Sequence, residues 1–340
     1  MHREKEWSKT SLPHSLQVWN NKKMKVTEIL NQAKKPLFTF ELVPPLKGGN
    51  AETLLETVRQ LSVYEPAYIN VTNHQQEVVY VERPDGLLER KTVRKRPGTV
   101  ALSALIQYTF NIPVVAHLIC GGMSREELED TLVELNFLGI DNVLALRGDP
   151  PAGQKRFMPV NGGYEHSSEL VSQIVNMNQG RYLDDQLRDA QKTNFCIGVA
   201  GYPEKHAEAA NLFSDMEYLK YKVDCGAEYI VTQMFFDNAQ FYRFVEDCRK
   251  AGINVPIIPG IKPIGSKRDL LTIPQTFHID LPSELVALLE KANKLSEVKE
   301  VGVYWCRKQA KDLIEHGVRG VHFYTLGKAE SVSRVVKEVY

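Results

Sequence analysis

The chain has 340 residues, and its 42 basic and 42 acidic side chains give a formal net charge of zero. Without a net positive field, binding to nucleic acid or to an anionic membrane is not expected to be its main task. Hydrophobic residues make up 43% and charged residues 25% of the chain, which is typical of a globular protein with a full core. This length leaves one large domain or two open.

No apolar run approaches the roughly 18 residues of a membrane span, and the first 25 residues lack the apolar stretch of a secretory signal. We therefore expect a cytoplasmic enzyme. The five cysteines form an odd set without C-x-x-C spacing, which argues against a disulfide framework and against a structural zinc site. We expect them to be reduced and mostly buried, and we expect no metal site.

Residues 1–25 are polar and carry Trp7 and Trp19. We interpret them as an N-terminal arm, with a part of an oligomer contact as the alternative. From residue 26 to residue 340, short β-branched runs alternate with amphipathic stretches, which is typical of βα units around a parallel sheet. We interpret residues 26–340 as one catalytic domain.

Eight such units occur in the chain. The expected strands are Leu37–Val43, Ala67–Thr72, Val114–Ile119, Asn142–Arg147, Cys196–Ala200, Tyr229–Met234, Pro256–Gly260 and Gly320–Thr325. Expected helices include Ala51–Tyr64, Ser124–Leu138, Ala207–Cys225, Gln240–Ala251 and Val301–Glu315. Eight consecutive units favour an α/β fold of the closed (β/α)8 TIM-barrel type over an open doubly wound sheet with the same element order.

Two segments interrupt this alternation. The basic run Arg90–Arg96 is expected to be a solvated loop, with contact to a phosphate as the alternative. The Gly- and Pro-rich segment Pro150–Tyr164 has no periodicity, so it is expected to be a long loop after the fourth strand, on the side where a barrel keeps its active-site loops.

Polar residues at the carboxyl ends of strands are the candidates for catalysis in a barrel. The first strand places Glu41 within an apolar turn closed by Pro44 and Pro45. Burial there would raise the pKa of this carboxyl, so that it can act as a general acid near neutral pH. The alternative is a structural Glu41 paired with an arginine or lysine of the core.

The fourth strand ends in Arg147-Gly148-Asp149, where a guanidinium, exposed backbone N–H groups and a carboxylate can surround an anionic or heteroaromatic ligand. On the expected helix after the fifth strand, Asp215, Tyr218 and Lys222 share one face. That face is either solvated or directed at a cofactor. Other strands end in polar residues as well, namely His117, Thr232, Gln233, His322 and Tyr324.

Some motifs are absent. No strand is followed by G-x-G-x-x-G or by the P-loop pattern, so a nucleotide cofactor would have to be held in a way that suits a barrel. Lys262, after the seventh strand, offers a second reading of the chain, because a lysine can form an imine with a carbonyl substrate as in lyases and aldolases.

At these strand ends the chain resembles the methylenetetrahydrofolate reductase family of flavin-dependent barrel enzymes. The matching segments follow the same order from about residue 35 to the C-terminus. They are Phe40–Pro45, Val71-Thr72, Ala116–Cys120, Ala145–Pro151, Ala200–His206, Thr232–Asp237, Ile257–Ile261 and His322–Leu326.

The resemblance implies a barrel that binds FAD non-covalently at its carboxyl-terminal face. NADH or NADPH and the folate would use the same flavin face in turn, so that 5,10-methylenetetrahydrofolate becomes 5-methyltetrahydrofolate, the methyl source for methionine synthesis. It also implies a homo-oligomer. Because the chain ends at Tyr340, just after the last expected helix, it should correspond to the catalytic barrel without the S-adenosylmethionine-binding domain of longer members.

Residue by residue, Glu41 matches the general acid of the family, and Asp149 matches the carboxylate near flavin and pterin. Gln233 matches the pterin-binding glutamine, and Tyr324 and Lys328 fall near the folate tail. Positions that contact FAD in the family are matched by Thr72, His117, Arg147, Gly148, Asp149, Ser167, Tyr202, His206, Asp215, Tyr218 and Lys222.

The chain departs from the family pattern at three places. Asn73-His74-Gln75 replaces an aromatic residue and a small-residue turn, and Asp269 stands where a glutamine is often found. Lys328 replaces a common arginine, which would turn a bidentate grip on the folate carboxylate into a point-charge contact. A flavin- or folate-binding protein without turnover is a third reading of the chain.

Overall fold

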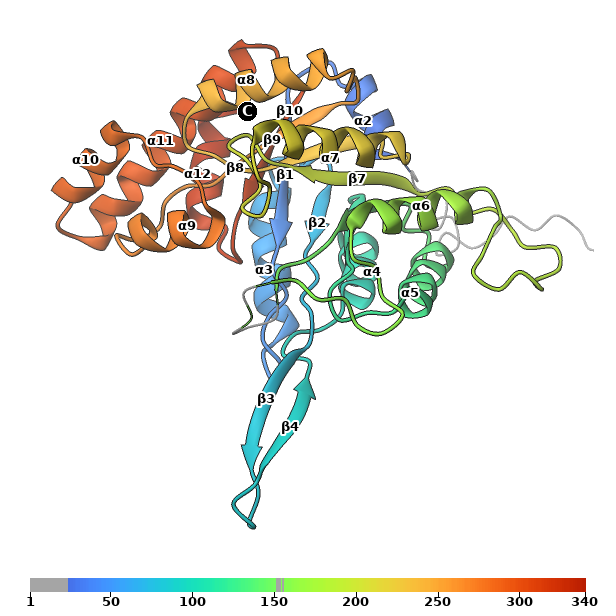
Figure 1. The fold of residues 1–340 in the computed structure, drawn as a ribbon. Coiled ribbons are helices and arrows are strands. Elements are labelled where there is room, and N and C mark those ends of the chain that lie inside the picture. Colours follow the sequence, from blue (N-terminus) through green and yellow to red (C-terminus); the bar gives the residue numbers. More distant parts are fainter. Residues whose placement is uncertain (1–23, 151–153, 155) are drawn as a thin grey trace, which may run out of the picture.

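In the computed structural model, which describes residues 24–150, 154 and 156–340, eight parallel strands close into a barrel in the order β1-β10-β9-β8-β7-β6-β5-β2 (Figure 1). The predicted TIM barrel is confirmed. The strands are β1 Leu37–Leu42, β2 Ile69–Val71, β5 Val114–Ile119, β6 Asn142–Leu146, β7 Cys196–Gly201, β8 Tyr229–Met234, β9 Ile257–Ile261 and β10 Gly320–Tyr324.

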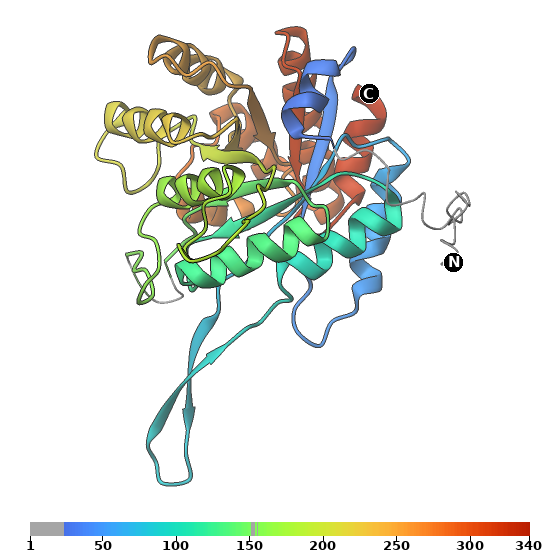
Figure 2. The same cartoon turned by 90° about the vertical axis from the view of Figure 1, so that its right-hand side faces the viewer.

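Helices surround the barrel on its outside (Figure 2). They are α2 Val26–Gln32, α3 Ala51–Ser62, α4 Thr99–Phe110, α5 Arg125–Phe137, α6 Ser167–Asn178, α7 Leu212–Asp224, α8 Asn238–Lys250, α9 Asp269–Phe277, α10 Ser283–Lys291, α11 Leu295–Glu315 and α12 Glu330–Val339. The sequence places α7 five residues too early, because Asn211 caps the helix by accepting a hydrogen bond from the Ser214 N–H. The capping box predicted at Ser124 and Glu127 opens α5.

The strands bury both of their faces, which is why they read as apolar runs. On β1, Phe38 and Phe40 pack outward against the surrounding helices, so the alternating residues Thr39 and Glu41 face the barrel interior. Helix α2 covers the amino-terminal end of the barrel, where the Val26 N–H donates to Asn142 Oδ1 over 2.9 Å. The carboxyl-terminal end is thereby left as the end open to ligands.

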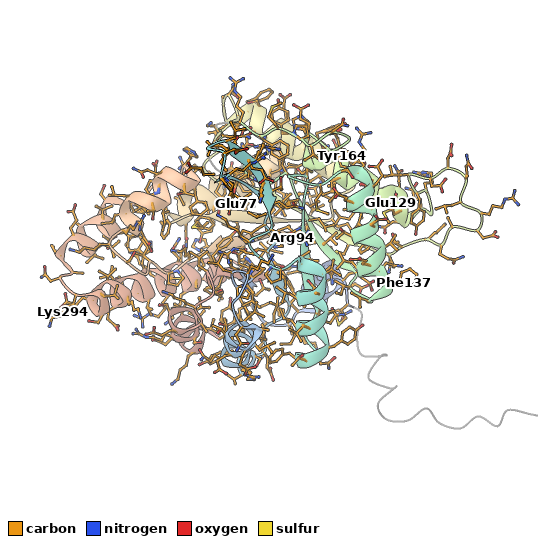
Figure 3. All side chains as sticks on the ribbon, turned by 90° about the horizontal axis from the view of Figure 1, so that it is seen from below. Glu77, Arg94, Glu129, Phe137, Tyr164 and Lys294 are labelled. Atoms are coloured by element: carbon orange, nitrogen blue, oxygen red, sulfur yellow. The ribbon has the colours of Figure 1, made fainter. Side chains whose placement is uncertain are left out.

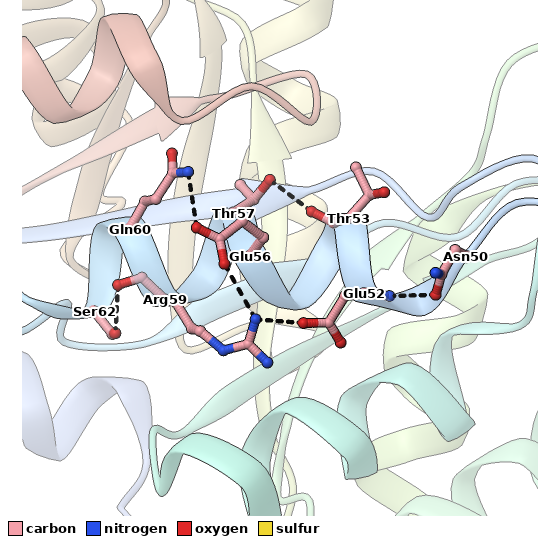
Figure 4. A network of polar contacts seen from close by, with 8 residues as sticks. All are labelled: Asn50, Glu52, Thr53, Glu56, Thr57, Arg59, Gln60 and Ser62. Atoms are coloured by element: carbon pink, nitrogen blue, oxygen red, sulfur yellow. Dashed lines mark hydrogen bonds and ion pairs between the residues drawn. The ribbon is translucent and has the colours of Figure 1, made fainter.

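Helix α3, which follows β1, carries a network of polar side-chain contacts (Figure 4). Asn50 caps it by accepting from the Glu52 N–H over 2.8 Å. The guanidinium of Arg59 lies 2.6 Å from Glu52 and 3.1 Å from Glu56, and all three side chains are about half exposed. Exposed pairs of this kind add only tenths of a kcal/mol each, so burial of Leu54, Val58 and Leu61 against the sheet supplies most of the stability.

The sequence interpretation was wrong for the basic run at residues 90–96. A two-stranded antiparallel ribbon, β3 Glu77–Glu82 and β4 Leu88–Val93, projects from the barrel between β2 and α4 (Figures 1 and 2). Glu77 and Arg94 mark its base in Figure 3. The run is therefore largely strand rather than loop. Its charged side chains are exposed on an extended backbone, which removes the apolar alternation by which strands are recognised.

All five cysteines are free, and only Cys225 is partly exposed, as expected. No helix in the described part of the chain is long and apolar enough to cross a membrane. The predicted arm with Trp7 and Trp19 lies outside the described residues apart from its last two positions, where the chain enters α2.

Candidate active site

The carboxyl ends of all eight strands meet at one rim, because every strand of the barrel runs in the same direction. This rim brings together predicted residues from β1, β5, β8 and β10 and from the loops after β6 and β7. Two cavities of about 400 and 440 Å³ lie elsewhere, one beside α2 at the opposite end and one along α6.

Glu41 lies near the end of β1 and is only 7% exposed. Its strand neighbours in register are Asn70 and Tyr324. Burial raises the pKa of the Glu41 carboxyl to about 8. Among the described residues Glu41 forms no ion pair, so the alternative of a structural partner in the core finds no support. The Glu41 carboxyl is thus protonated at neutral pH and able to give up a proton.

Tyr324 stands beside Glu41 at the end of β10. Its hydroxyl donates to the Thr232 carbonyl oxygen over 2.6 Å, and burial holds its pKa well above the ordinary value. The tyrosine ring meets His322 edge-on, with ring centroids 5.1 Å apart. A side chain at Gly260 would overlap this ring and the Thr232 carbonyl oxygen, so glycine is required there.

Two histidines lie within the barrel below this rim. His322 Nδ1 is 2.8 Å from Thr39 Oγ1, whereas His117 Nε2 is buried with no hydrogen-bond partner in the described structure. Burial lowers the pKa of both imidazoles to about 3, so both are neutral. Neutral rings of this kind can orient a ligand by hydrogen bonding but do not supply charge. The free Nε2 of His117 is a position that a ligand would satisfy.

The turn after β6 carries Arg147, Gly148 and Asp149. Arg147 forms a bidentate ion pair with Glu208, with N···O distances of 2.6 and 2.9 Å. Gly148 has a φ of +89°, a left-handed backbone conformation that favours glycine. Asp149 is exposed, and its carbonyl oxygen accepts a 2.7 Å hydrogen bond from Gln75 Nε2. The carboxylate of Asp149 therefore faces solvent at the rim.

The loop after β7 and helix α7 form one side of the rim. Tyr202 and His206 meet edge-on at 4.7 Å, and the His206 N–H donates to Asp215 Oδ2 over 2.8 Å. Lys222 Nζ donates to the Ala200 carbonyl oxygen over 2.6 Å, and burial lowers its pKa to about 8. Tyr218 is 62% exposed. Asp215 and Lys222 thus point toward the barrel, whereas Tyr218 points to solvent.

The other predicted residues are spread along the same end of the barrel. Thr72 donates to the Leu42 carbonyl oxygen over 3.2 Å, and half-buried Gln233 accepts from the Met234 N–H over 2.9 Å. Ser167 is the first residue of α6. Lys328 is exposed in the loop between β10 and α12, and no ion pair engages it in the part of the chain that the structure describes.

Sequence reasoning missed two contacts at this rim. Glu208 fixes Arg147, although its position after the Tyr202–His206 segment gave no sign of a role. Gln75 holds the Asp149 backbone, and its place in the unusual triplet after β2 was the available signal. This contact also places the triplet Asn73-His74-Gln75, where the chain departs from the family pattern, beside the turn after β6.

Lys262 is paired rather than free. Its Nζ lies 3.2 Å from Asp269 Oδ2, and both side chains are mostly buried. Asp269 also accepts hydrogen bonds from the Gly265 N–H and from Ser266 Oγ, each over 2.9 Å. An ammonium held by a carboxylate in this way does not offer the neutral amine that imine formation needs. The unusual Asp269 therefore organises its own loop together with Lys262.

A closed barrel with a buried, protonated acid at a polar carboxyl-terminal rim defines the class of the protein as an α/β barrel with a candidate active site. The chain belongs to the methylenetetrahydrofolate reductase family, because the family model described as Methylenetetrahydrofolate reductase matches residues 25–340. This establishes the family that the sequence resemblance implied.

Individual relatives agree with this. The chain is 34% identical over 304 residues to methylenetetrahydrofolate reductase (NADH) 1 of Arabidopsis thaliana, covering 86% of this chain and 46% of the plant protein. It is 30% identical over 310 residues to 5,10-methylenetetrahydrofolate reductase of Pectobacterium carotovorum subsp. carotovorum. This match covers 89% of this chain and 91% of the bacterial protein. The chain thus spans about half the length of the plant and fungal relatives it matches.

Among solved structures, the chain is similar to an uncharacterized protein from Clostridium thermocellum that binds two copies of 5-methyl-5,6,7,8-tetrahydrofolic acid. The TM-score is 0.55 at 14% identity, and the match covers 93% of this chain and 99% of that one. At this identity the likeness supports the fold.

Proposed function

We propose that the chain is a methylenetetrahydrofolate reductase that reduces 5,10-methylenetetrahydrofolate to 5-methyltetrahydrofolate, with NADH or NADPH as donor. The observation that carries the proposal is the unpaired, protonated Glu41 at the rim of a barrel of this family. Bound FAD would supply hydride transfer between nicotinamide and folate. The product would provide methyl groups for methionine synthesis.

The residues at the rim suit an anionic flavin nucleotide. The buried His117 Nε2 has no partner, which leaves an unsatisfied position for a polar group of the cofactor. Arg147 and Lys222 supply positive charge, and Gly148 has no side chain that would keep a ligand from its backbone N–H. The residues proposed to hold FAD are Thr72, His117, Arg147, Gly148, Asp149, Ser167, Tyr202, His206, Asp215, Tyr218 and Lys222.

Glu41 is proposed as the general acid. Its carboxyl would donate a proton to the folate ring nitrogen that leaves as the imidazolidine ring opens, so that a cation forms at the remaining nitrogen. The exposed carboxylate of Asp149 would stabilise this cation and hold the pterin. Burial keeps Glu41 protonated while Asp149 faces water, so the two carboxyl groups have different roles.

The folate is proposed to lie between Gln233 and Tyr324, with Lys328 near its tail. Tyr324 is already committed to Thr232 through its hydroxyl, so the face of its ring is what it offers to the substrate. Lys328 is exposed and offers a point charge to a carboxylate.

The visible spectrum of the purified protein tests the cofactor. Bound oxidised flavin absorbs at roughly 450 nm, and a protein that stays colourless with added FAD would count against the proposal. Bleaching by NADH or NADPH without air, followed by return of colour with methylenetetrahydrofolate, separates the enzyme from a binding protein without turnover.

We also propose that residues 26–340 form one catalytic domain preceded by an arm at residues 1–25, that the protein is cytoplasmic, and that it forms a homo-oligomer. The zero net charge supports small-molecule substrates rather than nucleic acid or membrane as partners. The anionic substrates would then be attracted only by local groups such as Arg147 and Lys328.

A further inference from the structure

The β3–β4 ribbon has no place in the proposed chemistry. It leaves the carboxyl-terminal rim after β2 and projects away from the barrel (Figures 1 and 2). Within the described residues each of its strands pairs only with the other, so both have one open edge. A two-stranded ribbon that packs on nothing is marginally stable in water, which calls for a partner.

The two open edges differ in composition. β4 carries the consecutive charges Glu89, Arg90 and Lys91, which is how natural proteins protect an edge strand from pairing. β3 carries the apolar run Val78–Val81, in which Tyr80 is 65% exposed. An unbroken apolar run is typical of a central strand, covered on both sides by neighbours. The edge of β3 is therefore the one built for pairing.

The hydrogen-bond pattern shows which groups face that edge. The Arg83 N–H donates to the Leu87 carbonyl oxygen over 2.8 Å, so these two residues form a hydrogen-bonded pair. In an antiparallel ladder such pairs alternate with pairs whose backbone groups point outward. Counting back in the observed register, Val78, Tyr80 and Glu82 direct their N–H and C=O groups to the open edge.

We propose that β3 pairs antiparallel with β3 of a second copy of this chain, which makes a four-stranded sheet with the charged β4 strands outermost. In the register we propose, Tyr80 lies opposite Tyr80 of the second copy, and Val78 lies opposite its Glu82. All three outward-facing residues then form hydrogen-bonded pairs. A shift by one residue would instead bring inward-facing backbone groups to the interface.

Charge complementarity supports a second copy as the occupant. In the same register Glu77 lies opposite Arg83 of the second copy at both ends of the paired strands. Within its own chain Glu77 also contacts Lys95 and Arg83 also contacts Asp85, so the second copy would extend these exposed ion pairs. A shift by two residues would lose both of these oppositely charged pairs and leave one outward-facing residue of each strand without its hydrogen-bonded pair. The strand is thus complementary to itself in backbone direction and in the charges at its two ends, and the tip of each ribbon would lie beside the base of the other.

Cysteine cross-linking tests the register. Residues in a hydrogen-bonded antiparallel pair have Cα atoms about 5.5 Å apart, which a disulfide can span. Tyr80→Cys should therefore form a disulfide-linked dimer under mild oxidation, seen as a doubled mass without reductant. Arg90→Cys is the matched control, because Arg90 is the ribbon partner of Tyr80 on the opposite, charged edge. Equal cross-linking of the two variants would overturn the proposal.

Proline substitution at the same two positions tests the pairing itself. Tyr80→Pro and Arg90→Pro each remove an N–H that points away from the ribbon, so the ladder between β3 and β4 keeps its donors. By sedimentation velocity, the wild type should have a multiple of the monomer mass, Tyr80→Pro half of the wild-type mass, and Arg90→Pro the wild-type mass. A monomeric wild type, or equal masses for the two variants, would refute the proposal. No step depends on the proposed catalytic function.

Discussion

Glu41 and Tyr324 are partners in register on the adjacent parallel strands β1 and β10, and the tyrosine hydroxyl donates to the Thr232 carbonyl oxygen. Tyr324 thus lies beside Glu41 but gives its hydroxyl hydrogen to another group. With no such hydrogen bond from Tyr324, burial is what raises the pKa of the Glu41 carboxyl, to about 8.

Replacing Glu41 by Gln should separate the two halves of the proposed reaction. The amide keeps the shape but cannot donate a proton, so folate reduction should fall by about 10²–10⁴-fold. Flavin reduction by nicotinamide should stay within a few-fold of wild type, as measured by anaerobic stopped-flow absorbance. Wild-type turnover of methylenetetrahydrofolate by this variant would remove Glu41 from its role.

The folate half-reaction should depend on pH through Glu41. Because the acid form is the active one and its pKa is about 8, the rate should fall as the pH rises through 8. The pKa is raised in the folded protein, so the stability that Glu41 contributes is present at low pH and is lost as the pH rises toward and through 8. Glu41→Gln should therefore gain Tm relative to wild type at pH 9 but not at pH 5. An equal difference in Tm between the variant and the wild type at pH 5 and at pH 9 would contradict the buried environment assigned to Glu41.

The Arg147–Glu208 pair should govern cofactor binding. Glu208→Gln leaves the half-buried guanidinium without a bidentate partner, so FAD affinity should fall by about 10-fold or more, corresponding to roughly 1.4 kcal/mol. Glu300→Gln is a matched control, since Glu300 forms an exposed bidentate pair with Arg334. Flavin fluorescence titration measures the FAD affinity of both variants. Equal affinities of Glu208→Gln and Glu300→Gln would show that the ion pair with Glu208 does not position Arg147 for the cofactor.

Gly260 should be intolerant of a methyl group. A Cβ there would overlap the Thr232 carbonyl oxygen and the Tyr324 ring, so Gly260→Ala should cost about 1–3 kcal/mol of unfolding free energy. It should also raise the KM for folate, because Tyr324 moves. Gly265→Ala is the control, as its Cβ would meet only Asp269 Oδ2 at 3.9 Å. Chemical denaturation and steady-state kinetics compare the two variants.

The Lys262–Asp269 pair should behave as a structural unit. Lys262→Leu or Asp269→Gln alone leaves a mostly buried charge without its partner. Breaking a fully buried ion pair in this way lowers the free energy of unfolding by about 3–5 kcal/mol, and the loss should be smaller for this partly exposed pair. The double variant should recover most of the lost stability. Loss of activity in Lys262→Leu that the double variant does not recover, together with borohydride trapping of an imine at Lys262, would revive the lyase interpretation.

Most of the fold could be predicted from the sequence because the barrel strands bury both faces. Runs such as Val114–Ile119 and Tyr229–Met234 are apolar and end in turn residues, and the structure reproduces both strands as predicted. The β3–β4 ribbon could not be predicted in the same way. Its strands are exposed, and Arg90 and Lys91 give the second strand the composition of a loop.

The candidate site was predictable where a single residue type is anomalous in its setting, as for a carboxyl at the end of an apolar strand. Contacts between segments that are distant in the sequence could not be predicted. Glu208 meets Arg147 across 61 positions of the chain, and Gln75 meets Asp149 across 74. Such pairs depend on how loops cross the rim, which no local pattern encodes.

The most direct test of the proposed function is an anaerobic titration of the purified, FAD-loaded protein in two steps, followed at about 450 nm. The account predicts that NADH or NADPH bleaches the flavin and that methylenetetrahydrofolate restores its colour with formation of 5-methyltetrahydrofolate. A flavin that nicotinamide does not bleach, or a bleached flavin that methylenetetrahydrofolate does not reoxidise, would contradict it.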